Sequence, residues 1–217
     1  MAKLMANEKA DMVFTDPPYN VRYVGMTKQW DRLQNDALGE AEFALFLENA
    51  FANIGVVMLP SAGLYICHAD KTQIAFRTAL ESNGFEWRAT IVWIKNQPAF
   101  NMAQYKYKHE PIYYLFKRGQ VVRWYGDANE TTVWEVKRAS KNEYHSTQKP
   151  VELVEIAIQN SSLVKQIVLD LFGGSGSTLI ACEKLGRKCR MMEIDEHYCD
   201  VIIQRWQNFT GQKAVKL

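Results

Sequence analysis

A strand, a glycine-rich turn, a helix and a second strand follow one another between residues 166 and 194, and this unit constrains the fold most strongly. The mostly apolar residues 166–171 predict a buried strand, and a helix over 178–185 ends at Gly186. Residues 188–194 predict the second strand. Two parallel strands joined by a helix belong to a parallel sheet covered by helices. We therefore expect an α/β fold.

The turn at residues 172–177 is suited to a nucleoside-bearing cofactor. Its glycines let the backbone approach a ligand at a helix N-terminus, and Glu193 beyond the helix can accept hydrogen bonds from both ribose hydroxyls. A triphosphate-binding loop needs a lysine, whereas Gly176 is followed directly by Ser177. A dinucleotide fingerprint needs glycine or alanine at Leu179. A glycine-rich turn without a ligand remains the alternative.

A second candidate site is the tetrapeptide Asp16-Pro17-Pro18-Tyr19, which follows a short apolar strand at residues 11–15. The Asp16 carboxylate and the Pro17 carbonyl are both acceptors, so together they suit a group with two N–H donors, such as the amine of a nucleobase. The two prolines stiffen the turn, and Tyr19 offers a flat face for stacking. A plain turn that begins with Asp-Pro is the alternative.

The rest of the chain alternates helical and strand-like segments, as one α/β domain of 217 residues would. Apolar residues from Phe43 to Val57 recur at helical spacing, and Pro60 is expected to follow the helix end. The other segments are strands at 64–67, 85–95 and 111–116 and helices at 71–82 and from Pro150 to about 158, with β-prone pieces at 121–125 and 131–136. Residues 20–36 are expected to form a loop that could close over a substrate.

Charge is distributed unevenly along the chain. Net charge is +2, yet residues 88–149 hold eleven Lys or Arg against five Asp or Glu. Aromatic residues are interleaved there, which suits phosphate contact and base stacking, although a solvated face would show the same charge. We interpret residues 96–143 as a small insert that recognises a nucleic acid. The helix that begins near Pro150, with Lys149 beside it, could bind carboxylate or phosphate or could simply be capped.

The chain is expected to be cytoplasmic, because it shows no signal-peptide pattern and no apolar run long enough to span a membrane. Its four cysteines, Cys67, Cys182, Cys189 and Cys199, lack metal-ligand spacing. We interpret them as reduced core residues and expect no metal site.

Taken together, the sequences D-P-P-Y-N, H-S-T-Q-K-P, D-L-F-G-G-S-G-S-T and M-E-I-D resemble the DNA amino-methyltransferases in the permuted motif order called the beta group. The resemblance covers nearly the whole chain and is nearest to phage- or plasmid-type enzymes that carry a ParB-like domain. It implies a Rossmann-like fold with a mostly parallel twisted sheet and helices on both faces. It also implies S-adenosylmethionine as the cofactor and double-stranded DNA as the substrate, and a homodimer is possible.

The resemblance also assigns site residues. Asp16, Pro17, Pro18 and Tyr19 would be catalytic, and Glu193 would bind the ribose of the cofactor. Thr147 and Lys149 fall in the motif that lies against the methionine end of the cofactor. The remaining cofactor residues lie in or beside the glycine-rich turn: Asp170, Phe172, Gly173, Gly174, Gly176 and Thr178.

Two departures from the family pattern are visible. Ser146 stands where proline is usual, and no acidic motif precedes the strand before Asp16. We therefore expect either a fragment that lacks an N-terminal segment, or cofactor binding that is weakened or completed by another subunit.

The implied activity is methyl transfer to the 6-amino group of an adenine flipped out of the duplex, since D-P-P-Y is usual in adenine enzymes and S-P-P-Y in most cytosine ones. Methylation of the cytosine 4-amino group is the nearest alternative, and RNA is a further possible substrate. A non-catalytic DNA-binding or cofactor-sensing module is the alternative of another class.

Overall fold

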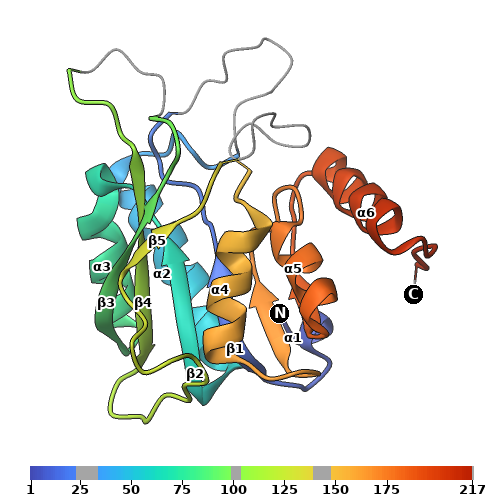
Figure 1. Ribbon diagram of the computed structural model, residues 1–217. Helices are drawn as coiled ribbons and strands as arrows, with labels where there is room; N and C mark the ends of the chain where they lie inside the picture. Colours follow the sequence, from blue (N-terminus) through green and yellow to red (C-terminus); the bar gives the residue numbers. More distant parts are fainter. Residues whose placement is uncertain (23–33, 99–103, 139–147, 217) are drawn as a thin grey trace.

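The computed structural model describes residues 1–22, 34–98, 104–138 and 148–216, and within them a seven-stranded sheet forms the centre of the molecule (Figure 1). The strand order is β5-β3-β4-β2-β1-β6-β7. The strands are β1 Ala10–Thr15, β2 Met58–Cys67, β3 Phe85–Ile94, β4 His109–Lys117, β5 Val133–Glu135, β6 Ile167–Asp170 and β7 Lys188–Met191. The helices are α1 Ala2–Met5, α2 Glu40–Val57, α3 Gln73–Ser82, α4 Val151–Ser161, α5 Ser177–Leu185 and α6 Glu196–Thr210, with a 3-10 turn at Asp70–Thr72.

Strand direction brings most of the candidate residues to one edge of the sheet. β1 pairs in parallel with β2 and β6, β6 pairs in parallel with β7, and β3 with β5. Among the strands of the described residues, only β4 is antiparallel to its neighbours, β2 and β3. The carboxyl ends of the parallel strands therefore meet the amino end of β4 at one edge, which is where open α/β sheets bind ligands. The predicted Rossmann-like fold with a mostly parallel sheet is confirmed.

Helices cover both faces of this sheet, as predicted. On one face α2 and α3 bury Phe43, Phe51 and Phe76 against the strands. On the other face α4 and α5 bury residues such as Leu153 and Ala181. The buried positions of α2 recur every three or four residues, so its amphipathic pattern is what attaches it to the sheet.

Two predicted boundaries differ from the structure, and one helix was not predicted. Pro60 lies inside β2, which begins at Met58 directly after α2. The pairing of β1 with β2 shifts register between Ala10 and Met12, and a proline is tolerated beside such an irregularity because a regular ladder bond is not required there. The strand expected over 188–194 ends at Met191, and the helix α6 that follows was not predicted.

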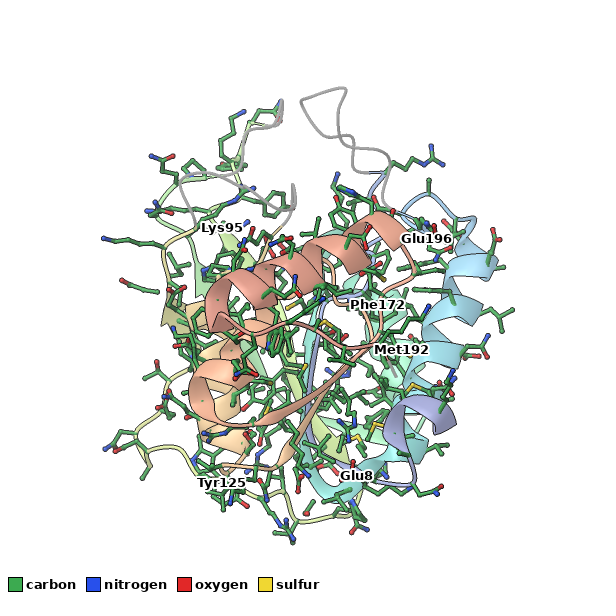
Figure 2. All side chains as sticks on the ribbon, turned by 90° about the vertical axis from the view of Figure 1, so that its right-hand side faces the viewer. Glu8, Lys95, Tyr125, Phe172, Met192 and Glu196 are labelled. Carbon is green, nitrogen blue, oxygen red and sulfur yellow. The ribbon has the colours of Figure 1, made fainter. Side chains whose placement is uncertain are left out.

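The β-prone residues 121–125 form no strand. Instead the Arg123 and Tyr125 N–H groups donate to the carbonyls of Ser61 and Asn160. Ser61 lies near the start of β2 and Asn160 near the end of α4, so this segment lies at the opposite end of the sheet from Asp16. Figure 2 shows the same separation, with Tyr125 and Glu8 at one end of the molecule and Lys95 at the other.

The predicted insert also contains structural strands of the main sheet. β4 lies between β2 and β3, and β5 pairs with β3, so both belong to the core.

All four cysteines are free. Cys67 and Cys182 are buried core residues, as predicted, whereas Cys189 and Cys199 are only partly buried, so the predicted core position is wrong for these two. None of the helices in the described residues has the length and apolar character needed to cross a membrane.

Candidate active site

Asp16 immediately follows β1, and both of its carboxylate oxygens are engaged. The Tyr19 hydroxyl donates to Oδ1 at 2.6 Å, and the Lys149 ammonium donates to Oδ2 at 2.6 Å. Pro17 is buried, whereas Asp16, Pro18 and Tyr19 are partly exposed. Each carboxylate oxygen has two lone pairs, so Asp16 is held in one orientation and still has acceptor capacity. The structure thus brings the predicted tetrapeptide and Lys149 together.

Tyr19 is held at both its hydroxyl and its ring. Its hydroxyl also lies 3.2 Å from Lys149 Nζ, and its ring packs edge-on near Phe76, with the centroids 6.3 Å apart. Burial and the nearby Asp16 raise the pKa of Tyr19 well above its ordinary value, so the phenol stays protonated and remains a donor. Base stacking by Tyr19 stays a prediction.

Lys149 reaches the site from the residue before Pro150, the N-cap residue of α4. Its side chain is 8% exposed, and its Nζ lies 3.2 Å from Glu110 Oε2 as well as 2.6 Å from Asp16. The Ser177 hydroxyl donates to the Lys149 carbonyl at 2.7 Å, which ties Lys149 to the start of α5. This placement directs the ammonium at two carboxylates, an arrangement that the sequence pattern did not indicate.

Glu110 and Lys95 were missed by sequence reasoning. Glu110 lies at the amino end of β4, where it pairs with Trp93 of β3. Lys95 directly follows β3. Their side chains pair at 2.5 Å. A usable signal was present, because each is a charged residue next to an apolar strand, at the edge where ligands bind.

The charges in this cluster stabilise one another. Burial acts to raise the pKa of Glu110, but the neighbouring Lys149 and Lys95 outweigh it and lower that pKa to about 2. Burial likewise acts to lower the pKa of Lys149, but Asp16 and Glu110 hold it above its ordinary value. Both groups are therefore ionised at neutral pH.

The glycine-rich turn requires its glycines for two different reasons. A Cβ on Gly173 would lie 2.6 Å from the sulfur of Met191, so that glycine permits close packing on β7. Gly174 has φ +50°, and a Cβ there would point into open space. Figure 2 shows Phe172 and Met192 next to one another beside this turn, where the Gly173 N–H donates to the Met192 carbonyl at 2.8 Å.

Asp170 and Thr178 organise the turn from within. Both are 3% exposed, and Asp170 accepts hydrogen bonds from Thr178 at 2.6 Å, from Thr15 at 2.7 Å and from the Phe172 N–H at 3.1 Å. Burial raises the pKa of Asp170 to about 7 despite these hydrogen bonds. Since Thr15 precedes Asp16, this cluster joins the tetrapeptide directly to the turn.

Glu193 lies two residues beyond β7 and bridges to the turn. Its Oε2 accepts from the Gly174 N–H at 2.7 Å, and its Oε1 accepts from the N–H groups of Ile194 and Asp195 at 2.8 and 2.9 Å. The carboxylate is partly exposed and oriented, with lone pairs left for further donors.

Arg205 of α6 was not assigned a role from the sequence, yet it reaches the same turn. It is 9% exposed and donates to the Ser175 carbonyl at 2.8 Å and to the hydroxyls of Ser175 and Ser177 at 3.2 and 3.3 Å. Figure 2, which looks onto α6, shows this helix crossing in front of the sheet, with Glu196 labelled at its start.

Several predicted features lie at the edge of the described residues. Thr147 and most of the predicted closing loop at residues 20–36 fall outside them. The ends of that loop are joined, because Asn20 and Leu38 exchange two hydrogen bonds and the Arg22 N–H donates to the Asp36 carbonyl.

The turn and its surroundings fit a nucleoside-bearing cofactor. Open space adjoins the left-handed Gly174, and the oriented carboxylate of Glu193 stands beside it. Asp16 lies at the same edge of the sheet, because the hydrogen bond from Thr15 to Asp170 joins the end of β1 to the end of β6. A ligand bound along the turn would therefore be close to the acceptors of the tetrapeptide.

Comparison with known proteins gives a consistent result. A family profile described as "DNA methylase" matches residues 10–205. The chain is 25% identical over 221 residues to the type II methyltransferase M2.LlaDCHI of Lactococcus lactis subsp. cremoris, covering 91% of this chain and 82% of the relative. It is 27% identical over 224 residues to the type II methyltransferase M2.DpnII of Streptococcus pneumoniae, covering 93% and 84%.

Among solved structures, the fold is similar to that of M1.HpyAVI in complex with S-adenosylmethionine. The TM-score is 0.72 at 25% identity, and the match covers 93% of this chain and 90% of the other.

Proposed function

Because the chain belongs to the DNA methylase family, we propose that it transfers a methyl group to the 6-amino group of an adenine in double-stranded DNA. It is an S-adenosylmethionine-dependent DNA methyltransferase, as predicted. The single observation that carries the proposed site is the hydrogen bond from Thr15 to Asp170, at 2.7 Å. It joins the strand that presents Asp16 to the strand that presents the glycine-rich turn.

Asp16 and the Pro17 carbonyl would hold the adenine amine by accepting its two N–H groups. In this position the nitrogen lone pair can be directed at the methyl carbon, and positive charge that develops on nitrogen is stabilised by the Asp16 carboxylate. When bound, the cofactor would supply the methyl group, and its neutral thioether would be the leaving group. The amine would lose a proton to solvent, either as the new N–C bond forms or after it has formed.

The target base must leave the duplex to reach Asp16. Unstacking the base costs a few kcal/mol. Stacking on an aromatic ring and hydrogen bonds to the base return a free energy of the same order. Tyr19 is the proposed stacking residue. Its hydroxyl is committed to Asp16, so stacking would use the exposed part of the ring.

The cofactor is proposed to lie along the turn, against Phe172, Gly173, Gly174 and Gly176, with Glu193 on its ribose. Asp170 and Thr178 would act indirectly, because they are buried and hydrogen-bonded to each other. Thr147 is proposed for the methionine end, and Lys149 for the junction between that end and Asp16.

Target recognition is proposed for the connections at the carboxyl edge. Residues 104–108 between β3 and β4 are exposed and include Tyr105, Lys106 and Lys108, and Lys137 is exposed just after β5. These residues combine positive charge with aromatic rings. A cytoplasmic location and a homodimer are further proposals, which cell fractionation and light scattering of the purified chain would test.

The test is to incubate the purified chain with radiolabelled S-adenosylmethionine and unmethylated genomic DNA, digest the DNA, and identify the labelled nucleoside. We expect label on 6-methyl-deoxyadenosine and none with Asp16→Ala, which should still bind DNA. Label on 4-methyl-deoxycytidine would replace adenine with cytosine as the target. DNA binding without any transfer would favour the non-catalytic module.

A further inference from the structure

Four charged side chains form an alternating chain that leads from the tetrapeptide into the sheet. Lys149 Nζ lies 2.6 Å from Asp16 Oδ2 and 3.2 Å from Glu110 Oε2, and Lys95 Nζ lies 2.5 Å from Glu110 Oε1. The side chains of Lys149 and Lys95 are 8% and 5% exposed, and those of Asp16 and Glu110 are each 24% exposed. Two positive and two negative charges make the group neutral as a unit.

The four residues come from four separate parts of the chain, so the tertiary structure assembles them. Asp16 follows β1, Lys95 follows β3, Glu110 lies in β4 and Lys149 precedes α4. Placing one ion in a mostly buried site is costly unless it is paired, and each of these four charges has an opposite charge within 3.2 Å. Removing Glu110 would leave the buried Lys95 without a counterion in this cluster, and removing Lys149 would leave Asp16 without one.

Lys149 is shared between Asp16 and Glu110, and this affects the chemistry proposed for Asp16. The amine nitrogen becomes positively charged as the N–C bond forms, so the reaction is favoured by negative charge on Asp16. An ammonium bound only to Asp16 would neutralise that charge. Glu110 is a second carboxylate that attracts the same ammonium and so reduces its neutralisation of Asp16.

We propose that Glu110 is a positioning residue for methyl transfer, which holds Lys149 between two carboxylates so that Asp16 stays oriented yet retains its negative charge. Lys95 in turn holds Glu110 in place. This inference rests on the proposed role of Asp16. Lys149 orients Asp16 and Tyr19 together, since it contacts both.

The groups that face Lys149 are Asp16 and Tyr19 from the turn after β1, Cys67 at the end of β2 and Glu110 from β4. Burial raises the pKa of Cys67 well above its ordinary value, so it stays a neutral thiol. Two carboxylates therefore keep Lys149 protonated. Replacing Glu110 by glutamine removes one of them, and the pKa of Lys149 should fall.

The experiment compares steady-state kinetics and pH profiles of the full chain with Glu110→Gln, Glu110→Asp and a control, Glu86→Gln. Glu86 is an exposed carboxylate of β3 that pairs with Phe116, far from Asp16 along the strands. We expect Glu110→Gln to lower kcat by about tenfold or more, with KM for DNA and cofactor changed by less than about threefold. The alkaline limb of the pH profile of kcat should move to lower pH in Glu110→Gln. Glu110→Asp should recover part of kcat.

A purely structural ion pair predicts a different result. Glu110→Gln would then lower the melting temperature but leave kcat and the alkaline limb unchanged, which would overturn the proposal. If Glu110→Gln does not fold, Lys95→Met tests the same point, because it leaves Glu110 with Lys149 alone. A wild-type kcat in that variant would count against the proposal. Methyl transfer that persists in Asp16→Ala would instead refute the proposed role of Asp16.

Discussion

At the scale of single residues, Asp170 is a buried carboxyl whose ionisation opposes folding. Its pKa is raised from 3.8 to about 7 by burial. A carboxyl whose pKa is higher in the folded state than in the unfolded state stabilises the folded state fully at pH values below its unfolded-state pKa. This contribution is lost as the pH rises through its folded-state pKa. A shift of this size corresponds to roughly 4 kcal/mol.

We predict that Asp170→Asn removes this pH dependence. The difference in unfolding free energy between wild type and variant should move in favour of the variant from pH 4 to pH 8, by up to about 4 kcal/mol. Urea titrations at several pH values measure it, and the remaining ionisable groups cancel in the difference. A difference in unfolding free energy that does not change with pH would contradict the raised pKa of Asp170.

The glycines of the turn allow a matched comparison. Gly174→Ala places a Cβ in the open space beside the turn and imposes strain of about 1 kcal/mol at its positive φ. We expect the affinity for S-adenosylmethionine to fall by about tenfold, with a small change in melting temperature. Gly173→Ala should instead lower the melting temperature sharply, because its Cβ would lie 2.6 Å from Met191 Sδ. Calorimetric titration and thermal melts distinguish the two, and unchanged cofactor binding by Gly174→Ala would place the cofactor elsewhere.

At the scale of elements, α6 is attached to the glycine-rich turn in part through Arg205. Ile202 adds a contact, since a Cβ on Gly176 would lie 3.2 Å from its side chain. Most of the helix is exposed or only partly buried. The helix therefore contributes to the site through the residues that touch the turn.

We predict that Arg205→Met loosens the turn more than the whole fold. Its hydrogen bonds to Ser175 and Ser177 are lost, so affinity for S-adenosylmethionine should fall several-fold, roughly 1 kcal/mol. Hydrogen exchange should accelerate in α6 and in residues 173–177. Gln204→Ala, an exposed neighbour in the same helix, is the control. Equal effects in both variants would mean that Arg205 has no special role.

At the scale of the whole molecule, the proposed DNA-binding charge lies at one end of the sheet. Lys108 precedes β4 and Lys137 follows β5, both at the carboxyl edge, whereas Arg123 lies near Asp11 at the opposite end. Phosphate contacts by lysine release counterions, so they determine how steeply DNA affinity depends on salt.

We predict that Lys108→Ala with Lys137→Ala weakens DNA binding and reduces the slope of log affinity against log salt by roughly 1.8, the value for two phosphate contacts. Arg123→Ala should leave both affinity and slope unchanged. Fluorescence anisotropy with a labelled duplex at several salt concentrations provides the measurement. A larger loss from Arg123→Ala would place the DNA on the opposite end.

Local patterns in the sequence determined much of this protein. The β-α-β unit, the tetrapeptide after β1 and the helix that begins after Pro150 all depend on short-range spacing, and each was predicted within a few residues. The helix α6 was missed, although Asp195, which accepts from the His197 and Tyr198 N–H groups, was a readable helix start.

Only the tertiary structure decided how these pieces meet. The strand order puts β1 beside β6, the antiparallel β4 brings Glu110 to the carboxyl edge, and Lys149 turns toward two carboxylates that lie far away in the chain. The tertiary structure also places residues 121–125 at the opposite end of the sheet from the site. The physical reason is that ion pairing and strand pairing depend on distance in space, whereas sequence periodicity reports only on neighbours along the chain.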